Sequence, residues 1–324
     1  MALLLIATGG TISLQADGPG APRYEGRELL ALVEPATSGH EVVVEDVGSR
    51  RSGDVTLADM RELAALVAAR SAEVSGIVIT HGTDTLEEVA YALALQAQPT
   101  VPVVLTGAMR RASHPGFDGV ANLGAAFAAA GCDELAGCGP VVVLNDEIHA
   151  ARWVAKVHTT SVAAFSSPGA GPIGRITEGR VEPLAQPPAG DHLGLPDALD
   201  KRVELVWGTA GGDGRLIEAA AAEADGLVIA GFGGGRLSAA MADAAVAAVA
   251  RLPVVIASRC GAGSTQRSSY HGHGSETQLL AEGLIGAGQL HPLKARLRLA
   301  VALALGLDPV EHFDNRTRQE STQE

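Results

Sequence analysis

The sequence has little of what marks disulfide-rich or zinc-stabilised proteins. It contains three cysteines in 324 residues, Cys132, Cys138 and Cys260. Because they are odd in number and lie outside any Cys-x-x-Cys spacing, we expect neither a disulfide framework nor a structural zinc site. We interpret the three side chains as buried or incidental thiols.

Long hydrophobic runs and positive charge are also scarce. The chain has no run of about 18 apolar residues, so no membrane-spanning helix is expected. The opening MALLLIA is apolar but has no basic leader or cleavage site, which predicts a cytoplasmic location. Lys and Arg total 24 against 37 Asp and Glu, giving a formal net charge of −13. This balance disfavours a nucleic-acid-binding protein, which needs clustered cations.

Short apolar runs alternate with helical patterns along the first half of the chain. Hydrophobic residues make up 47% of the sequence and aromatic residues only 3%, which suits elements packed through small side chains. Continuous Val, Ile and Leu runs predict strands that are covered on both faces, as in a parallel sheet. The expected strands are residues 3–8, 41–47, 76–80, 101–107 and 140–145, and the expected helices are residues 56–70, capped by Thr56 with Asp59, and 84–97.

The pattern predicts an α/β protein of two domains. Residues 1–184 form a larger, doubly wound, mainly parallel sheet domain that ends in a hairpin with its turn at Glu178-Gly179. Residues 185–202, rich in proline, glycine and charge, form the expected linker. Residues 203–324 form a smaller α/β domain. Its expected elements are a strand at 225–232, a helix at 237–252, a strand at 253–259 and a helix at 294–307.

Two polar segments follow predicted strands, at the position where parallel sheets bind ligands. ATGGTIS (7–13) places Thr11 after two glycines, and THGTDT (80–85) places Thr83 beside Asp84. A threonine hydroxyl becomes a nucleophile when a neighbouring group accepts its proton, which a tyrosine or a lysine–carboxylate pair can do. The two segments therefore indicate an acyl-transfer centre. Each threonine also suits an ordinary turn, and Asp84 suits a helix N-cap.

Together, ATGGTIS and THGTDTLEE resemble the two signature segments of bacterial-type L-asparaginases, a family that includes glutaminase-asparaginases and related amidases. VVLTGAMR (103–110) and ARWVAKVHTTSVAAF (151–165) resemble the family's next segment and its lysine segment. The likeness runs from residue 3 to about residue 176. It returns more weakly in GLVIAGFGGG and PVVIASRCGAG.

The resemblance implies catalytic roles for five residues. Thr11 matches the primary nucleophile, which attacks the side-chain amide and releases ammonia through an acyl-enzyme. Tyr24 matches the tyrosine of a lid, here the proline- and glycine-rich residues 14–26. Thr83, Asp84 and Lys156 match the family's second triad. Whether Thr11 or a water activated by Thr83 makes the first attack stays open.

The resemblance also implies a substrate-binding set. Ser52 aligns best with the serine that holds the substrate α-carboxylate, with Ser49 as the alternative. Asp84 would pair with the α-ammonium group, and the carbonyl of Ala108 would contact the leaving amide. The oxyanion hole would be built from main-chain groups around Gly10, Gly82 and Thr83.

Several positions depart from the family pattern. Gly53 stands where several members carry Gln or Glu to hold the α-amine, which predicts weaker recognition of that group. The second-domain loops offer Gly234, Arg236 and Glu276 where many members supply Asn and Glu from a neighbouring subunit. GFGGGR lacks the third glycine of a dinucleotide site, and YHGHG lacks convincing metal partners. We expect local hydrogen bonds for His81.

The predicted function is hydrolysis of L-asparagine to L-aspartate and ammonia, with L-glutamine as a minor substrate. One alternative is an amidase acting on a D-amino-acid, modified or peptide-linked amide, and another is a non-catalytic amino-acid sensor. The proposed chemistry requires no cofactor or metal. The expected partner is a small-molecule amide, with no nucleic acid and no membrane. The family resemblance implies a homotetramer built as a dimer of dimers.

Overall fold

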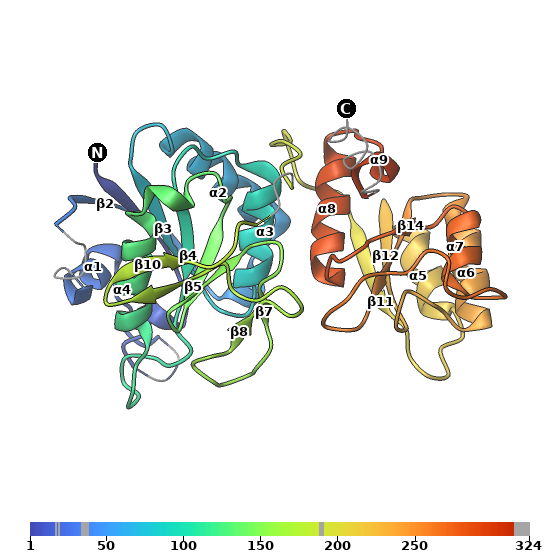
Figure 1. Ribbon diagram of the computed structural model, residues 1–324, viewed down its shortest axis with the longest axis horizontal. Helices are drawn as coiled ribbons and strands as arrows, with labels where there is room; N and C mark the ends of the chain where they lie inside the picture. The colour runs from blue at the N-terminus through green and yellow to red at the C-terminus, as the bar shows by residue number, and fades with distance from the viewer. Residues whose placement is uncertain (17, 19, 34–38, 188–190, 314–324) are drawn as a thin grey trace. The chain divides into compact units, whose positions relative to one another are not determined.

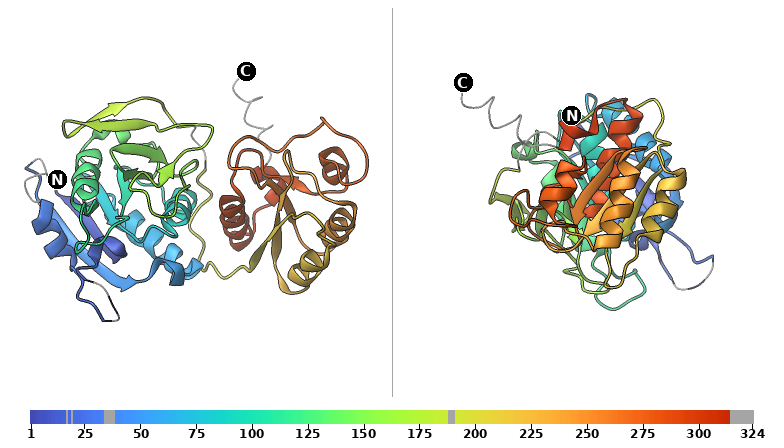
Figure 2. Two further views of the ribbon diagram at one scale, coloured as in Figure 1. Left: turned by 90° about the horizontal axis from the view of Figure 1, so that it is seen from below. Right: turned by 90° about the vertical axis from the view of Figure 1, so that its right-hand side faces the viewer.

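The computed structural model describes residues 1–324 except 17, 19, 34–38, 188–190 and 314–324, and leaves the Ser49 side chain undescribed. The chain divides into two compact units, Met1–His192 and Leu193–Glu324, each with a sheet of its own (Figure 2). This division falls within residues 185–202, and the domain limits 1–184 and 203–324 stay predictions.

The N-terminal unit contains a sheet of eight strands in the order β10-β9-β6-β5-β4-β3-β1-β2. The neighbours from β2 through β1, β3 and β4 to β5 pair in parallel, and β6, β9 and β10 extend the sheet in antiparallel fashion. The strands are β1 (Leu3–Gly9), β2 (Val42–Arg50), β3 (Gly76–Thr80), β4 (Val103–Thr106), β5 (Val141–Leu144), β6 (Glu147–Ala150), β9 (Gly174–Thr177) and β10 (Arg180–Pro183). The predicted, mainly parallel sheet is confirmed.

Helices cover both faces of this sheet (Figure 1). They are α1 (Gly26–Val33), α2 (Leu57–Arg70), α3 (Leu86–Gln96) and α4 (Gly119–Ala130). Helix α1 contacts α4, and α2 contacts α3. The strand order 2-1-3-4-5 with helices on two faces is that of a doubly wound fold, and its order reverses between β1 and β3.

Local sequence explains several element boundaries. Thr56 caps α2 and forms the predicted capping box with Asp59. The β9–β10 hairpin turns at Glu178 and Gly179, whose φ angles of 51° and 73° suit a two-residue turn. Strands β4 and β5 are shorter than predicted. Each begins just after a proline, Pro102 or Pro140, because proline has no N–H to donate to a neighbouring strand.

Small side chains let the layers of this unit approach closely. A Cβ atom on Gly76, the first residue of β3, would lie only 2.0 Å from the carbonyl oxygen of Ala130 at the end of α4. No larger residue fits between this strand and this helix end without displacing backbone. The low aromatic content therefore matches a core built from Ala, Val, Leu and Ile.

The C-terminal unit holds a four-stranded parallel sheet in the order β11-β12-β13-β14. Its elements are β11 (Val203–Trp207), α5 (Arg215–Glu223), β12 (Gly226–Gly231), α6 (Ala239–Val249), β13 (Val254–Ser258), α7 (Glu276–Ala281), β14 (Ile285–Gly286), α8 (Pro292–Ala304) and α9 (Pro309–Phe313). Helix α5 contacts α6, while α8 contacts β11, β12 and β13. The prediction that the smaller, C-terminal domain belongs to the α/β class is confirmed.

The remaining short elements lie in the N-terminal unit. They are the paired strands β7 (Ala155–Lys156) and β8 (Phe165–Ser166), and the 3₁₀ turns Thr11–Ser13, Ser52–Asp54 and Asp133–Leu135. Two of these turns and β7 carry predicted site residues. Over the described ranges of the chain, none of the helices combines the length and hydrophobicity needed to span a bilayer.

Candidate active site

The two signature segments meet where the strand order reverses. Strands β1 and β3 pair in parallel from Leu3–Gly76 to Ala7–Thr80, so their carboxyl ends lie at the same edge of the sheet. The connection after β1 leads toward β2 on one side, and the connection after β3 leads toward β4 on the other. Such a switch point opens a crevice between the two loops.

Glycines hold these two loops in direct contact. A Cβ on Gly10 would lie 2.5 Å from the backbone nitrogen of Gly82, and Gly10 has a φ of +88°. Both features require glycine. Thr11 and Thr83 each follow this contact by one residue. Since one chain step spans about 3.8 Å, their Cα atoms lie no more than about 12 Å apart.

Lys156 joins the second threonine to the aspartate. Its Nζ donates to Thr83 Oγ1 at 2.9 Å and to Asp84 Oδ1 at 2.7 Å. The short strand β7 carries this lysine, and the backbone N–H of Lys156 donates to Glu87 Oε1 in the first turn of α3 at 3.2 Å. The lysine therefore holds the Thr83 hydroxyl and the Asp84 carboxylate side by side.

Asp84 is not the N-cap of α3, which corrects one sequence-based interpretation. Thr85 occupies the N-cap position of that helix. The Asp84 side chain is 72% exposed, whereas the lysine that it pairs with is 17% exposed. One face of the carboxylate therefore remains open to a cationic ligand. An open depression of about 460 Å³ borders Asp84 and Lys156.

Ser52 comes from a third segment and lies against the same glycine contact. It begins the 3₁₀ turn Ser52–Asp54, is buried, and its Oγ would lie 2.6 Å from a Cβ on Gly82. The Thr85 hydroxyl donates to the Ser52 carbonyl at 2.9 Å. Gly53 is exposed, with open space where a side chain would begin. The side chain of the alternative, Ser49, lies outside the described residues.

The loop after β4 completes the crevice. A Cβ on Gly107 would lie 2.5 Å from the carbonyl oxygen of His81 and 3.3 Å from Thr83 Cγ2. Ala108 follows and is fully buried. Asn122 of α4 donates from Nδ2 to the Gly107 carbonyl at 3.0 Å. The predicted contact residue Ala108 is thus held beside the second signature segment.

Tyr24 reaches the first signature segment through the backbone. Its N–H donates to the carbonyl of Ser13 at 2.7 Å. Leu14 and Arg23, near the two ends of the predicted lid, form an antiparallel bridge. Pro19 of this loop lies outside the described residues. The Tyr24 side chain is half-buried against the core of the unit.

Sequence reasoning missed the residues that hold these loops in place. His81, for which local hydrogen bonds were expected, also makes a long-range one: its Nδ1 lies 2.7 Å from the Thr8 hydroxyl, while its Nε2 lies 3.2 Å from the Thr85 hydroxyl. Burial lowers the pKa of the His81 imidazole to about 4, so it is neutral at pH 7.

Asp118 also escaped notice. Its carboxylate accepts from the backbone nitrogens of Met109 and Arg110, at 3.0 and 2.9 Å, and so fixes the chain beyond Ala108. The Asp118–Asn122 spacing at the start of α4 was the available signal. Asn122 donates to Asp118 at 3.0 Å.

The predicted second-domain residues interact within their own unit. The Arg236 guanidinium lies over the ring of Tyr270, 4.2 Å from its centroid. Glu276 is buried, and its Oε1 accepts from the Tyr270 backbone nitrogen at 2.6 Å. His273 of the YHGHG segment pairs with Asp243 at 3.0 Å. Within the described part of the chain, no group of three or more His, Cys, Asp or Glu is arranged to hold a metal.

Comparison with known proteins identifies the same family in both units. Residues 2–189 match the model of the asparaginase N-terminal domain, and residues 202–312 match that of the glutaminase/asparaginase C-terminal domain. The chain is 40% identical to a probable L-asparaginase of Deinococcus radiodurans, covering 94% of this chain and 93% of the relative. It is 32% identical to a probable periplasmic L-asparaginase of Haemophilus influenzae, over 95% and 90% of the two chains.

A solved structure gives the same result in three dimensions. The crystal structure of a probable cytoplasmic L-asparaginase from Campylobacter jejuni superposes with a TM-score of 0.86 at 30% identity, covering 96% of this chain and 98% of that one. Family models that match both units, together with relatives aligned over nearly the whole chain, establish the relationship. The protein is therefore a hydrolase that belongs to the asparaginase family.

Proposed function

We propose that the protein hydrolyses the side-chain amide of L-asparagine to L-aspartate and ammonia. The observation that carries the proposal is the double contact of Lys156 Nζ with Thr83 Oγ1 and Asp84 Oδ1. This cluster lies one residue from the Gly10–Gly82 contact, and Thr11 follows the same contact by one residue on the other loop, which supports its proposed role. Binding alone requires neither two hydroxyl groups nor a lysine. A hydrolytic site uses all three.

Substrate binding follows from the charges that face the crevice. Asp84 presents a largely exposed carboxylate to the α-ammonium group. Ser52 offers a buried hydroxyl to the α-carboxylate. With both ends of the amino acid held, the side-chain carboxamide extends toward Thr11 and Thr83, with the Ala108 carbonyl facing its nitrogen. Holding the reactants in this way removes much of the entropic barrier to attack.

The reaction then proceeds in two steps. Thr11 Oγ attacks the carboxamide carbon and loses its proton, and main-chain N–H groups around Gly10, Gly82 and Thr83 stabilise the resulting oxyanion. The C–N bond breaks, ammonia leaves with the proton, and an ester joins Thr11 to the acyl group. Water then attacks the ester carbon, and the bond from that carbon to Thr11 Oγ breaks. The water proton passes by way of Thr83 and Lys156 to Thr11 Oγ, and L-aspartate is released.

A panel of amides tests this proposal. Purified protein is incubated with L-asparagine, L-glutamine, D-asparagine and a peptide-linked asparagine, and ammonia is measured. We expect release from L-asparagine and a smaller rate with L-glutamine. Thr11→Ala and Thr83→Ala should each lower turnover at least about 10²-fold. Binding of L-asparagine without ammonia release would instead support a sensor and contradict the proposal.

Trapping the intermediate separates the two orders of attack. L-Asparagine is mixed with the Thr83→Ala variant, the reaction is quenched in acid, and the peptide that contains Thr11 is analysed by mass spectrometry. An aspartyl ester on that peptide is expected when Thr11 attacks first. If water attacks first, no ester forms even where turnover is measurable.

Gly53 supports a second candidate, an amidase that accepts D-amino-acid, modified or peptide-linked amides. The position offers open space and no side chain to hold the α-amine. On this proposal the Michaelis constant for L-asparagine is high, and Gly53→Gln lowers it. Saturation by L-asparagine at micromolar concentration would contradict weakened recognition of the substrate α-amine. Release of ammonia only from another member of the panel would establish the second candidate.

We further propose that the chain works in the cytoplasm as a homotetramer. The proposed location follows the C. jejuni protein, which is described as cytoplasmic, whereas the H. influenzae relative is described as periplasmic. The assembly rests on the family resemblance. The proposed chemistry involves a small-molecule amide and requires no cofactor.

A further inference from the structure

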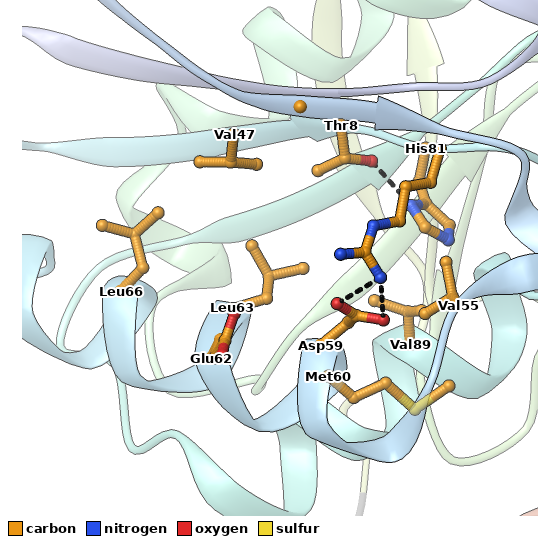
Figure 3. Close-up of a pocket in the computed structure, with 12 residues that line it drawn as sticks. Thr8, Val47, Val55, Asp59, Met60, Glu62, Leu63, Leu66, His81 and Val89 are labelled. Atoms are coloured by element: carbon orange, nitrogen blue, oxygen red, sulfur yellow. Dashed lines mark hydrogen bonds and ion pairs between the residues drawn. The ribbon is translucent and has the colours of Figure 1, made fainter.

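A cavity of about 230 Å³ lies between strand β2 and helix α2, apart from the depression at Asp84 and Lys156 (Figure 3). The two cavities share no lining residue. The proposed hydrolysis makes no use of this space. An engineered apolar cavity of about 150 Å³ is known to hold benzene, so this volume accommodates a branched aliphatic side chain.

Apolar side chains form a large part of the cavity walls. Figure 3 shows Leu63 and Leu66 projecting from α2 toward Val47 of β2. At one end, Thr8 and His81 form a polar pair joined at 2.7 Å. The apolar lining consists of Val47, Val55, Met60, Leu63, Leu66 and Val89. A ligand that fills this space would therefore gain mainly from the burial of apolar surface.

Both signs of charge line the same cavity. Arg50, Asp59 and Glu62 are among the residues that line it. The Asp59 carboxylate is held by Thr56 and Arg50, so Glu62 supplies the carboxylate for a ligand's ammonium group. Arg50 Nη1 pairs with Asp59 at 2.9 Å, and the Arg50 side chain is 63% exposed, so other guanidinium donors stay accessible. A guanidinium and a carboxylate in one cavity complement the carboxylate and the ammonium group of one small molecule. We infer that the cavity binds a free α-amino acid with an aliphatic side chain.

Hydrogen bonds connect the cavity with the Ser52 turn. His81 lines the cavity and contacts the Thr85 hydroxyl, which donates to the Ser52 carbonyl. Val55 also lines it, and the Val55 backbone nitrogen donates to the Ser52 carbonyl at 3.2 Å. An occupant that packs on Val55 and His81 stabilises the observed position of Ser52 against Gly82. On the proposed function, which gives Ser52 the substrate carboxylate, occupancy lowers the Michaelis constant for L-asparagine.

Calorimetric titration with L-leucine tests the site on the full chain. We expect saturable binding of one L-leucine per chain. 4-Methylpentanoate lacks the ammonium group and isoamylamine lacks the carboxylate, so each should bind at least about tenfold more weakly. Equal binding of all three compounds would mean that hydrophobic contact alone is at work, and the amino-acid assignment would be wrong.

Matched variants locate the binding. Arg50→Gln should weaken L-leucine at least about tenfold, whereas Arg51→Gln, which changes the neighbouring exposed arginine outside the cavity, should not. Leu63→Trp fills the cavity and should abolish binding. Ala69→Trp places the same ring at an exposed position of α2 and should preserve it. Unchanged L-leucine affinity in both Arg50→Gln and a folded Leu63→Trp overturns the proposal.

Competition separates this cavity from the substrate site. L-Aspartate, the expected product, should not displace L-leucine, and L-aspartate that does displace it would overturn the second site. In the ammonia assay, saturating L-leucine should lower the Michaelis constant about fivefold with kcat unchanged. A Michaelis constant that does not fall overturns the coupling. Because titration needs no turnover, failure of the proposed hydrolysis would leave the binding result intact.

Discussion

At the scale of single residues, the site depends on unequal burial of paired groups. Lys156 is mostly buried and gives Nζ hydrogen bonds to Thr83 and Asp84, while Asp84 faces outward. A cation removed from solvent interacts more strongly with its partners than a surface pair does. The same lysine thus supports charge on the buried hydroxyl and orients the exposed carboxylate.

Replacing this lysine tests its role. Lys156→Met keeps an unbranched side chain one atom shorter than lysine and removes the charge and its donors, so we expect kcat to fall at least about 10²-fold. Lys201→Met, which removes an exposed lysine of the C-terminal unit, serves as the control. Steady-state ammonia release gives kcat, and circular dichroism checks that both variants are folded. Nearly full activity of Lys156→Met would remove the lysine from the mechanism.

His81 gives the N-terminal unit a stability that depends on pH. Burial lowers its folded-state pKa to about 4, below the ordinary value of 6.5, so the unfolded chain binds more protons between these values. Stability contributed by this residue is complete above the unfolded pKa and is lost as pH falls toward 4. At about pH 4.5 the loss amounts to about 2–3 kcal/mol.

Urea unfolding at about pH 7.5 and 4.5 measures this effect. His81→Gln should reduce the pH dependence of the unfolding free energy by about 2–3 kcal/mol, and exposed His271→Gln should not. Burial, with Lys294 adding to it, also lowers the pKa of His291 to about 4 in the other unit. Fluorescence of Trp153 in a Trp207→Phe background therefore reports on the unit that contains His81. An unchanged pH dependence in His81→Gln contradicts the assignment.

At the scale of elements, three loops converge because glycines permit backbone contact. The loops that follow β1, β3 and β4 touch at Gly10, Gly82 and Gly107, and the Ser52 turn packs on Gly82. Parallel pairing brings the carboxyl ends of the strands to one edge of the sheet. The glycines then set how closely the loops approach. The crevice is therefore a property of the whole sheet edge.

A pair of glycine substitutions tests this packing. Gly10→Ala adds a Cβ 2.5 Å from the Gly82 nitrogen at a φ of +88°, so the loops must separate and turnover should fall at least about tenfold. Gly53→Ala should leave kcat within about twofold of the wild type, because no atom lies within 4 Å of the added Cβ. Equal activity of the two variants would show that close loop contact is not needed.

At the scale of the whole molecule, the chain consists of two units. The N-terminal unit is built around a mainly parallel sheet and the C-terminal unit around a parallel one. The described residues of the N-terminal unit include the proposed nucleophile, lysine triad and carboxylate-binding serine. Gly53, by contrast, adds no side chain to the proposed α-amine subsite beside the Asp84 carboxylate. Such a subsite is completed by a neighbouring subunit in the family that the sequence resembles, which motivates the tetramer.

Light scattering coupled to gel filtration tests the assembly. We expect a mass four times the 32.9 kDa of one chain. Dilution that dissociates the tetramer should raise the Michaelis constant, because completion of the site depends on the neighbour. A fully active species with the mass of one chain would exclude the proposed tetramer.

Much of the fold was predictable because it depends on local periodicity. Apolar runs marked β1 and β3, and the Thr56–Asp59 spacing marked the start of α2. Helix α4 was missed because its sequence, GVANLGAAFAAA, is apolar nearly throughout and shows no polar face. The prediction of Asp84 as a cap was wrong because Thr85 occupies that position and Asp84 instead pairs with a lysine 72 residues away.

The sequence by itself determined strands β1 to β5, β12 and β13, the glycine-flanked threonines and the family resemblance. These features are specified by residues that are close together in the sequence, so short segments are enough to predict them. Only the tertiary structure decided that His81 contacts Thr8 and that Lys156 contacts both Thr83 and Asp84. It also decided that a cavity lined by apolar and charged side chains lies beside β2. Such contacts arise from strand order and packing between distant segments, and no local spacing in the chain specifies them.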